Sequence, residues 1–119
     1  MTKILIADDE PNIVAALDFL LRRHGYEVQV ATTGQEAIDL VAAGKPDLVL
    51  LDVMMPVVNG YDVCRAIRAG ERGKDTRIVM LTAKGEQAEK AAAAGADLYF
   101  AKPFSTSELV GAIGQLLAR

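Results

Sequence analysis

Charged and hydroxyl side chains follow four short apolar runs of this 119-residue chain. Asp8 and Asp9 come directly after the first run, Asp52 after the second, Thr82 after the third and Lys102 after the fourth. The runs cover residues 4–7, 48–51, 78–81 and 98–101. If each run is a buried parallel strand, its carboxyl end lies at the edge where open α/β sheets hold their ligands. The pattern therefore predicts one site that contains all five side chains.

The three carboxylates of this predicted site favour a bound divalent cation. Two unit charges ~4 Å apart repel by about 4 kcal/mol at an effective dielectric of about 20, so Asp8, Asp9 and Asp52 would destabilise one another. Carboxylate oxygens are hard ligands, and a small set of them completed by water suits Mg²⁺, with Mn²⁺ able to replace it. The residues therefore indicate a magnesium site.

The lysine and the threonine add hydrogen-bond donors that suit a phosphoryl group. Magnesium held by carboxylates usually serves phosphoryl chemistry, and Lys102 and Thr82 would cover phosphate oxygens that the metal leaves free. Asp52 is the candidate nucleophile, because its carboxylate would form a mixed anhydride with the phosphoryl group. Such a site would modify itself covalently and later hydrolyse the product.

Alternating strands and helices must position these side chains. Apolar runs alternate with longer stretches of helical periodicity, which is typical of βαβ units around a parallel sheet. Most of the runs are apolar throughout and predict central strands, whereas Glu27–Val30 alternates polar with apolar and predicts an edge strand. We expect one α/β domain with a doubly wound, five-stranded parallel sheet of order 2-1-3-4-5. In that order Lys102 lies one strand beyond Thr82 and must lean back to approach Asp52.

Helix ends and caps have their own signals. Asn59 and Ser105 are predicted N-caps, because each precedes a helical stretch, and Glu108 completes a capping-box pattern with Ser105. The stretch 86–94 has only alanines as apolar residues, so its helix should bury little area. Glycines follow four helical stretches, and each is expected to end its helix in the left-handed conformation. These are Gly25, Gly44, Gly70 and Gly95.

The composition excludes several classes of function. With 51% hydrophobic residues, 24% charged residues and a net charge of −3, the chain is neither disordered nor basic enough to bind nucleic acid directly. One cysteine, Cys64, and one histidine, His24, are too few for a disulfide or a zinc set, so both are expected to be structural. No run is long enough for a signal-peptide core or a membrane span. We therefore expect a cytoplasmic protein that contacts neither membrane nor nucleic acid.

The site residues lie in segments that resemble the motifs of the response-regulator receiver family of two-component signalling. The segments are Asp8-Asp9, residues 52–56 with Asn59-Gly60, residues 81–83, and residues 102–104. The resemblance extends over nearly the whole chain and is to chemotaxis-regulator-like members. It implies a flavodoxin-like (βα)5 fold and a receiver domain over residues 1–119, with no effector domain in this chain.

The resemblance also implies a role for each residue of the metal site. Asp52 would be the phosphoacceptor and would share a Mg²⁺ with two other aspartates. Asp9 would bind the ion directly, and Asp8 would bind it mostly through water. The backbone carbonyl of Met54 would complete the set.

Three further residues would respond to the phosphoryl group. Thr82 would bond a phosphoryl oxygen, Lys102 would pair with the phosphate, and Tyr99 matches the aromatic switch position of the family. The domain would then catalyse only its own phosphorylation and dephosphorylation. Modification would change the surface made by the last two strands and their helices.

The partners implied by the resemblance are a phosphoryl donor and an output protein. The donor would be a histidine kinase or a histidine phosphotransfer protein, and the downstream effector is not identifiable from the residues. A phosphorylation-dependent homodimer is an alternative to a monomer.

Two other functions use similar residues but fit the chain less well. An aspartate-nucleophile phosphohydrolase usually needs a second aspartate two residues after the nucleophile, where this chain has Met54. A flavin-binding module would need Ser, Thr and Gly in the loops that cradle the cofactor phosphate, and such a run is missing. The dinucleotide fingerprint and the P-loop pattern are also missing.

Overall fold

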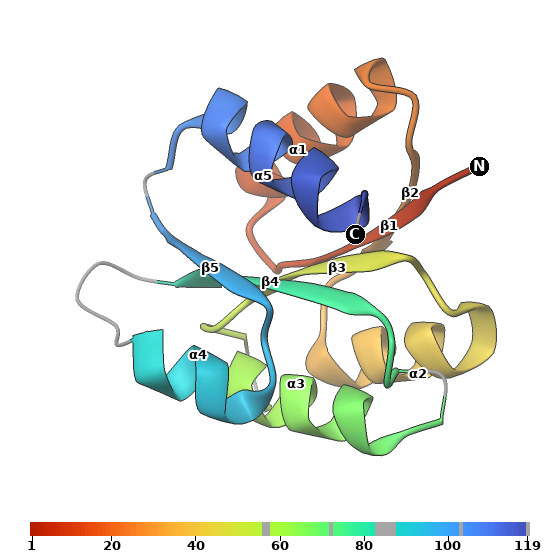
Figure 1. Cartoon of the computed structure of the whole chain (residues 1–119), viewed down its shortest axis with the longest axis vertical. Coiled ribbons are helices and arrows are strands. Elements are labelled where there is room, and N and C mark those ends of the chain that lie inside the picture. Colours follow the sequence, from red (N-terminus) through yellow and green to blue (C-terminus); the bar gives the residue numbers. More distant parts are fainter. Residues whose placement is uncertain (56–57, 72, 83–87, 103, 119) are drawn as a thin grey trace.

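The computed structural model describes residues 1–55, 58–71, 73–82, 88–102 and 104–118 (Figure 1). Within these residues, five strands and five helices alternate along the chain. The strands are β1 (Lys3–Ala7), β2 (Glu27–Ala31), β3 (Leu48–Asp52), β4 (Arg77–Thr82) and β5 (Leu98–Ala101). The helices are α1 (Pro11–Arg23), α2 (Gly34–Gly44), α3 (Gly60–Ala69), α4 (Ala88–Ala94) and α5 (Thr106–Leu117). Among the described residues, no helix combines the length and the apolar character needed to span a membrane.

The sheet has the predicted order β2-β1-β3-β4-β5, and each pair of neighbouring strands is parallel. All five residues of β3, the middle strand, are buried. The alternating strand β2 lies at one edge of the sheet, and the short strand β5 lies at the other. The fold class and the edge position of β2 are therefore confirmed.

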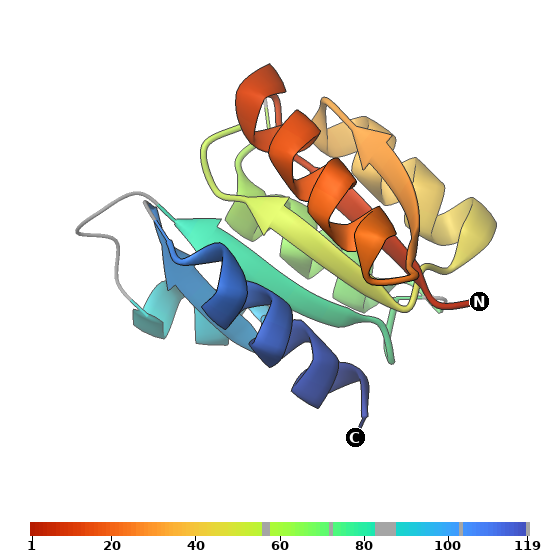
Figure 2. The same cartoon turned by 90° about the horizontal axis from the view of Figure 1, so that it is seen from above.

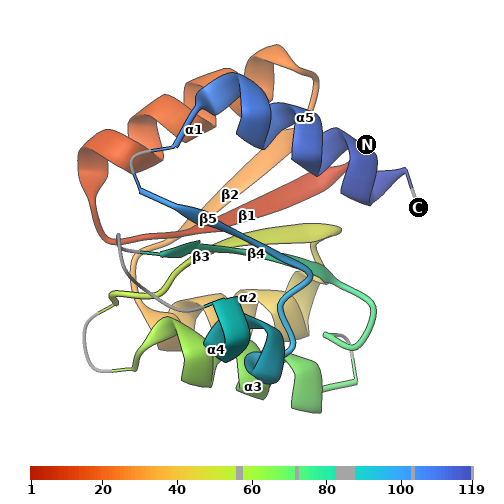
Figure 3. The same cartoon turned by 60° about the vertical axis from the view of Figure 1, so that its left-hand side comes forward.

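Helices cover both faces of the sheet. Figures 2 and 3 show α1 and α5 on one face, and α2, α3 and α4 on the other. Successive residues of a strand point to opposite faces. Leu48 and Leu50 accordingly join the core under α1 and α5, whereas Val49 and Leu51 join the core under α2 and α3. Cys64 of α3 is fully buried in this second core, which confirms its packing role.

The predicted N-caps of two helices are confirmed. Asn59 accepts a hydrogen bond from the Asp62 N–H at the start of α3, at 3.0 Å. Ser105 accepts one from the Glu108 N–H at the start of α5, at 3.3 Å. These bonds satisfy backbone donors that a helix N-terminus otherwise leaves without partners.

Two of the four glycine predictions are wrong. Gly25 and Gly95 have φ angles of 87° and 102°, as expected for a left-handed helix end. Gly44 is instead the last residue of α2, and Lys45 takes the left-handed conformation with φ of 40°. Gly70 follows α3 with an extended backbone, at φ −83° and ψ 153°. The reason at α2 is that the helix continues one residue further, which moves the left-handed position onto the lysine.

Candidate functional site

The structure brings the predicted side chains together at the carboxyl ends of the strands. Asp8 follows β1, Asp52 ends β3, Thr82 ends β4 and Lys102 follows β5. One carboxylate oxygen from each of Asp8, Asp9 and Asp52 lies within 4.8 Å of the others. The parallel topology therefore gathers residues from distant parts of the chain into one acidic pocket.

Lys102 leans back from β5 over the neighbouring strand, as predicted. Its Nζ lies 3.3 Å from Asp8 Oδ2 and 3.3 Å from Asp52 Oδ1, so one ammonium group bridges both carboxylates. The position of the lysine is fixed by its backbone, because the Lys102 N–H donates to the Thr82 carbonyl at 2.8 Å. Burial lowers the pKa of Lys102, but attraction by Asp52 and Asp8 outweighs it and leaves the pKa above its ordinary value. The amine is therefore a firmly charged group of the site.

Asp52 is a buried carboxylate, 3% exposed. Burial raises its pKa to about 6, and the charge of Asp8 adds to the rise. The charge of Lys102 and the Met54 N–H, which donates to Asp52 Oδ1 at 3.2 Å, act in the opposite direction. Burial is the largest cause of the rise, and the charge of Lys102 offsets it only in part.

A divalent cation would fit this set of oxygens. Asp8 and Asp52 are buried, whereas Asp9 is exposed, so the carboxylates line a site that is closed on one side and accessible to water on the other. Mg²⁺ combines a few carboxylate ligands with several waters, which suits this arrangement. The donor set therefore fits a Mg²⁺ held by Asp8, Asp9 and Asp52.

Local hydrogen bonds hold the ends of β1 and β3 in position. The Asp8 N–H donates to the Ala31 carbonyl at 3.1 Å, and Asp8 Oδ1 accepts from the Glu10 N–H at 2.9 Å. After β3, the Val53 N–H donates to the Leu81 carbonyl at 3.0 Å, and the Val53 carbonyl accepts from Gly60 at 2.8 Å. Val53, directly after Asp52, is therefore held against both β4 and the start of α3.

Gly60 is a site residue to which the sequence assigned no role. It begins α3, and a Cβ added there would lie 2.4 Å from the carbonyl oxygen of Asp52 and 2.6 Å from Cα of Val53. Both contacts are with backbone atoms, which cannot rotate away as a side chain can. A glycine after the capping Asn59, eight residues beyond Asp52, is the sequence signal for this close approach.

Thr82 and Tyr99 lie on the two neighbouring strands at the far edge of the sheet. The Thr82 side chain is buried, and its hydroxyl donates to the Phe100 carbonyl at 3.4 Å. Tyr99 pairs with Met80 in the register of β4 and β5, and the tyrosine is 46% exposed. The Thr82 hydroxyl therefore has a long hydrogen bond within the sheet, while the tyrosine side chain is largely accessible to solvent. The switch role of both residues stays a prediction.

Comparisons with known proteins identify relatives of this chain. Residues 4–114 match the family described as "Response regulator receiver domain". The response regulator MprA of Mycolicibacterium vanbaalenii is 43% identical over 119 residues, an alignment that covers 98% of this chain and 51% of MprA. The chain therefore spans about half the length of this curated relative.

Solved structures show the same fold around the same kind of site. The receiver domain of a sensor histidine kinase from Pseudomonas aeruginosa, solved with a magnesium ion coordinated in its active-site cleft, has 32% identity and a TM-score of 0.91. That alignment covers 99% of this chain and 98% of the other. The response regulator TrrA of Thermotoga maritima, solved in complex with Mg²⁺ and BeF, has 38% identity and a TM-score of 0.87, with 98% and 99% covered.

The fold and the acidic pocket together define a phosphoacceptor signalling domain. The chain belongs to the response-regulator receiver family of two-component signalling, whose members are partners of histidine kinases.

Proposed function

We propose that Asp52 is the residue that accepts the phosphoryl group, from a histidine kinase or a histidine phosphotransfer protein. The observation that carries this proposal is the position of its carboxylate, which is buried, 3.3 Å from Lys102 and adjacent to two further carboxylates. One Asp52 oxygen would attack the phosphorus of a phosphohistidine, the P–N bond would break, and its electron pair would leave with the imidazole. Water would later cleave the acyl phosphate, so the domain catalyses only its own modification and its reversal.

The metal ligands in this proposal are the carboxylates of Asp8, Asp9 and Asp52 and the backbone carbonyl of Met54. When bound, Mg²⁺ neutralises the clustered carboxylates and the charge of the transferring group, and Mn²⁺ would substitute for it. Asp8 is the buried member and is held by Lys102 and the Glu10 N–H, which suits a ligand that acts mostly through water. Asp9 is exposed and accessible to an incoming ion.

Lys102 and Thr82 would bind the phosphoryl oxygens. The Lys102 amine already lies within 3.3 Å of Asp52 and would transfer part of its interaction to the phosphate. The Thr82 hydroxyl would exchange its 3.4 Å bond to the Phe100 carbonyl for a charge-assisted bond. Tyr99, exposed on the adjacent strand, would follow as the switch residue.

Phosphorylation would shift a two-state equilibrium of the α4-β5-α5 surface. Moving a population from 1:99 to 99:1 requires about 5.5 kcal/mol. Hydrogen bonds to charged groups contribute ~1.5–3 kcal/mol each, so two or three bonds to a phosphate are sufficient. The changed surface would control an output partner or form a phosphorylation-dependent homodimer.

Residues 1–119 would act as one receiver domain in the cytoplasm. The net charge of −3 supports an output by protein contacts and not by direct binding of nucleic acid.

The test is the intact mass of the protein after incubation with acetyl phosphate and Mg²⁺. We expect a single phosphoryl adduct on the wild type and none on Asp52→Asn or in excess EDTA. Asp39→Asn is the matched control, because Asp39 is exposed on α2 and bonds only Gln35 among the described contacts. It should be modified as fast as the wild type. An adduct that forms equally on Asp52→Asn would show that another residue accepts the group.

A further inference from the structure

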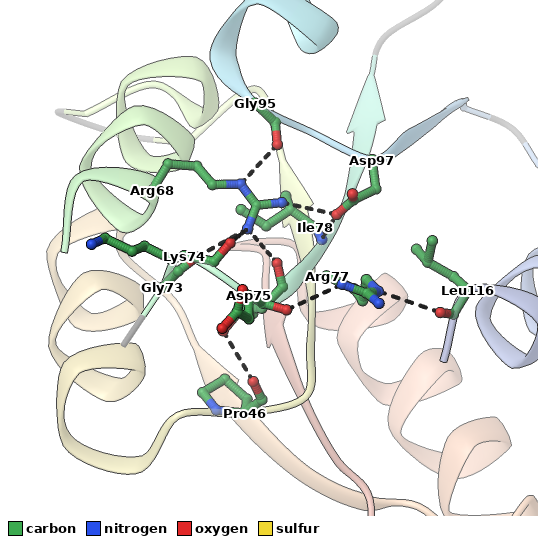
Figure 4. A network of polar contacts seen from close by, with 11 residues as sticks. Pro46, Arg68, Gly73, Lys74, Asp75, Arg77, Ile78, Gly95, Asp97 and Leu116 are labelled. Atoms are coloured by element: carbon green, nitrogen blue, oxygen red, sulfur yellow. Dashed lines mark hydrogen bonds and ion pairs between the residues drawn. The ribbon is translucent and has the colours of Figure 1, made fainter. Parts of the chain in front are cut away.

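The guanidinium group of Arg68 in α3 makes hydrogen bonds to two other segments of the chain, the loop before β4 and the turn before β5 (Figure 4). Its Nε donates to the Gly95 carbonyl at 2.9 Å, and its Nη2 pairs with Asp97 Oδ2 at 2.9 Å. Its Nη1 donates to three backbone carbonyls of the loop before β4, those of Gly73, Lys74 and Thr76. The Arg68 side chain is largely buried, so these bonds satisfy carbonyl groups that water reaches poorly.

Asp97 extends this network to the start of β4. Its Oδ2 accepts from the Ile78 N–H at 2.8 Å as well as from Arg68. Its own N–H donates to the Ile78 carbonyl at 2.8 Å. The turn also packs tightly on the arginine stem, because a Cβ added at Gly95 would lie 2.9 Å from Arg68 Cγ. Arg68 and Asp97 thus join the α4–β5 turn to both α3 and β4.

The segment that these bonds hold is attached to the core by apolar side chains that are small or only partly buried. We define the α4–β5 unit as residues 88–102. Its helix has seven residues, and the described buried side chains in it are Ala91 and Ala94. Its strand lies at the edge of the sheet, where Leu98 and Phe100 pack against the core but are only partly buried. Since small buried area means weak hydrophobic stabilisation, polar contacts must supply much of the attachment.

We infer that Arg68 and Asp97 form a latch that sets how often the α4–β5 unit opens as a unit of its own. The latch lies at the amino ends of β4 and β5, whereas Thr82 and Lys102 lie at the carboxyl ends. The unit carries both Lys102 and Tyr99, so the latch controls the freedom of the segment that connects the site to the exposed surface. This inference goes beyond the proposed function and holds whether or not Asp52 accepts a phosphoryl group.

Native-state hydrogen exchange on the unphosphorylated protein tests the latch. Four reporter amides within the unit are hydrogen-bonded, those of Gly95, Ala96, Asp97 and Lys102. The reference amides are those of Asp8 and Val53, which bond to β2 and β4. We expect the wild-type reporters to exchange through an opening with a smaller urea dependence than that of the references, because a local opening exposes less surface.

The substitution Arg68→Met removes all the hydrogen bonds of the guanidinium group and leaves Asp97 without its cation, while the bonds between Asp97 and Ile78 remain. The reporter amides should exchange about 10- to 100-fold faster, with their small urea dependence retained. Arg65→Met is the matched control, because Arg65 lies on the same helix but makes an exposed ion pair with Asp62. It should change reporter exchange by less than about threefold.

Asp97→Asn is a milder variant that still offers an oxygen to the Ile78 N–H. It should accelerate the same reporters about three- to tenfold. Two results would overturn the latch. The first is that, in the wild type, exchange of the reporter amides has the same urea dependence as exchange of the Asp8 and Val53 amides. The second is that Arg68→Met and Asp97→Asn leave the exchange rates of the reporter amides unchanged.

Discussion

Gly60 offers a sharp test of how the backbone positions Asp52, the proposed phosphoacceptor. The substitution Gly60→Ala would place a Cβ 2.4 Å from the Asp52 carbonyl oxygen and 2.6 Å from Val53 Cα. Real Cβ atoms essentially never approach closer than 3.0 Å, so the strand end and the helix start must separate by at least about 0.6 Å. Because both contacts are with backbone, the carboxylate of Asp52 must move with them.

Two magnitudes follow from this displacement. Overpacking in a tightly packed region costs ~1–3 kcal/mol, so the free energy of unfolding should fall by that amount. A misplacement of about 1 Å can slow a reaction roughly 100-fold, so a shift somewhat smaller than this should slow phosphorylation by about 10- to 100-fold. The slowing is expected because Asp52 leaves its 3.3 Å contact with Lys102.

The assays are urea unfolding and the rate of phosphorylation by acetyl phosphate with Mg²⁺. Gly111→Ala is the matched control, because Gly111 lies inside α5 and an added Cβ meets no atom within 4 Å. That variant should gain ~0.5–1 kcal/mol of stability and keep the wild-type rate. A Gly60→Ala variant with wild-type stability and rate would refute the reasoning.

Three further predictions concern other parts of the molecule. Mg²⁺ at about a hundredfold excess over its Kd should stabilise the wild type by about 2.7 kcal/mol in urea unfolding. The Asp9→Asn variant should lose most of this stabilisation by Mg²⁺. Its free energy of unfolding without metal should stay within about 0.5 kcal/mol of the wild type, since Asp9 is exposed. Undiminished stabilisation by Mg²⁺ would exclude Asp9 as a ligand. Burial raises the pKa of Cys64 to about 11 from 9.0. Native protein at pH 8 should therefore react with iodoacetamide at least about 100-fold more slowly than unfolded protein. Comparable rates would contradict the burial of Cys64. Lys45→Gly should raise the free energy of unfolding by ~0.5–1 kcal/mol, because glycine relieves the left-handed strain at φ of 40°, and a loss of stability would contradict that strain.

The sheet and the location of the site could be predicted because both follow from patterns that lie within single strands. A strand that is apolar on every residue must be covered on both faces, which made β3 central, and alternation made β2 an edge. Polar residues directly after such strands must then meet at one edge. The convergence of Asp8, Asp52 and Lys102 needed no knowledge of the loops between them.

The latch could not be predicted, because its partners have no sequence pattern. Arg65 and Arg68 lie one turn apart on α3, yet the first makes an exposed ion pair and the second binds carbonyls and Asp97 up to 29 residues away. Only the packing of the α4–β5 turn against α3 distinguishes them. The end of α2 was missed for a similar reason, because a one-residue continuation decided whether Gly44 or Lys45 took the left-handed position.

The central claim is that Asp52 carries the phosphoryl group. Reduction of the phosphorylated protein with borohydride converts an aspartyl phosphate to homoserine, and peptide mass spectrometry then locates the converted residue. The account predicts homoserine at position 52 and at no other aspartate, with none in protein treated without Mg²⁺. Homoserine at position 8 or 9, with Asp52 unchanged, would contradict it.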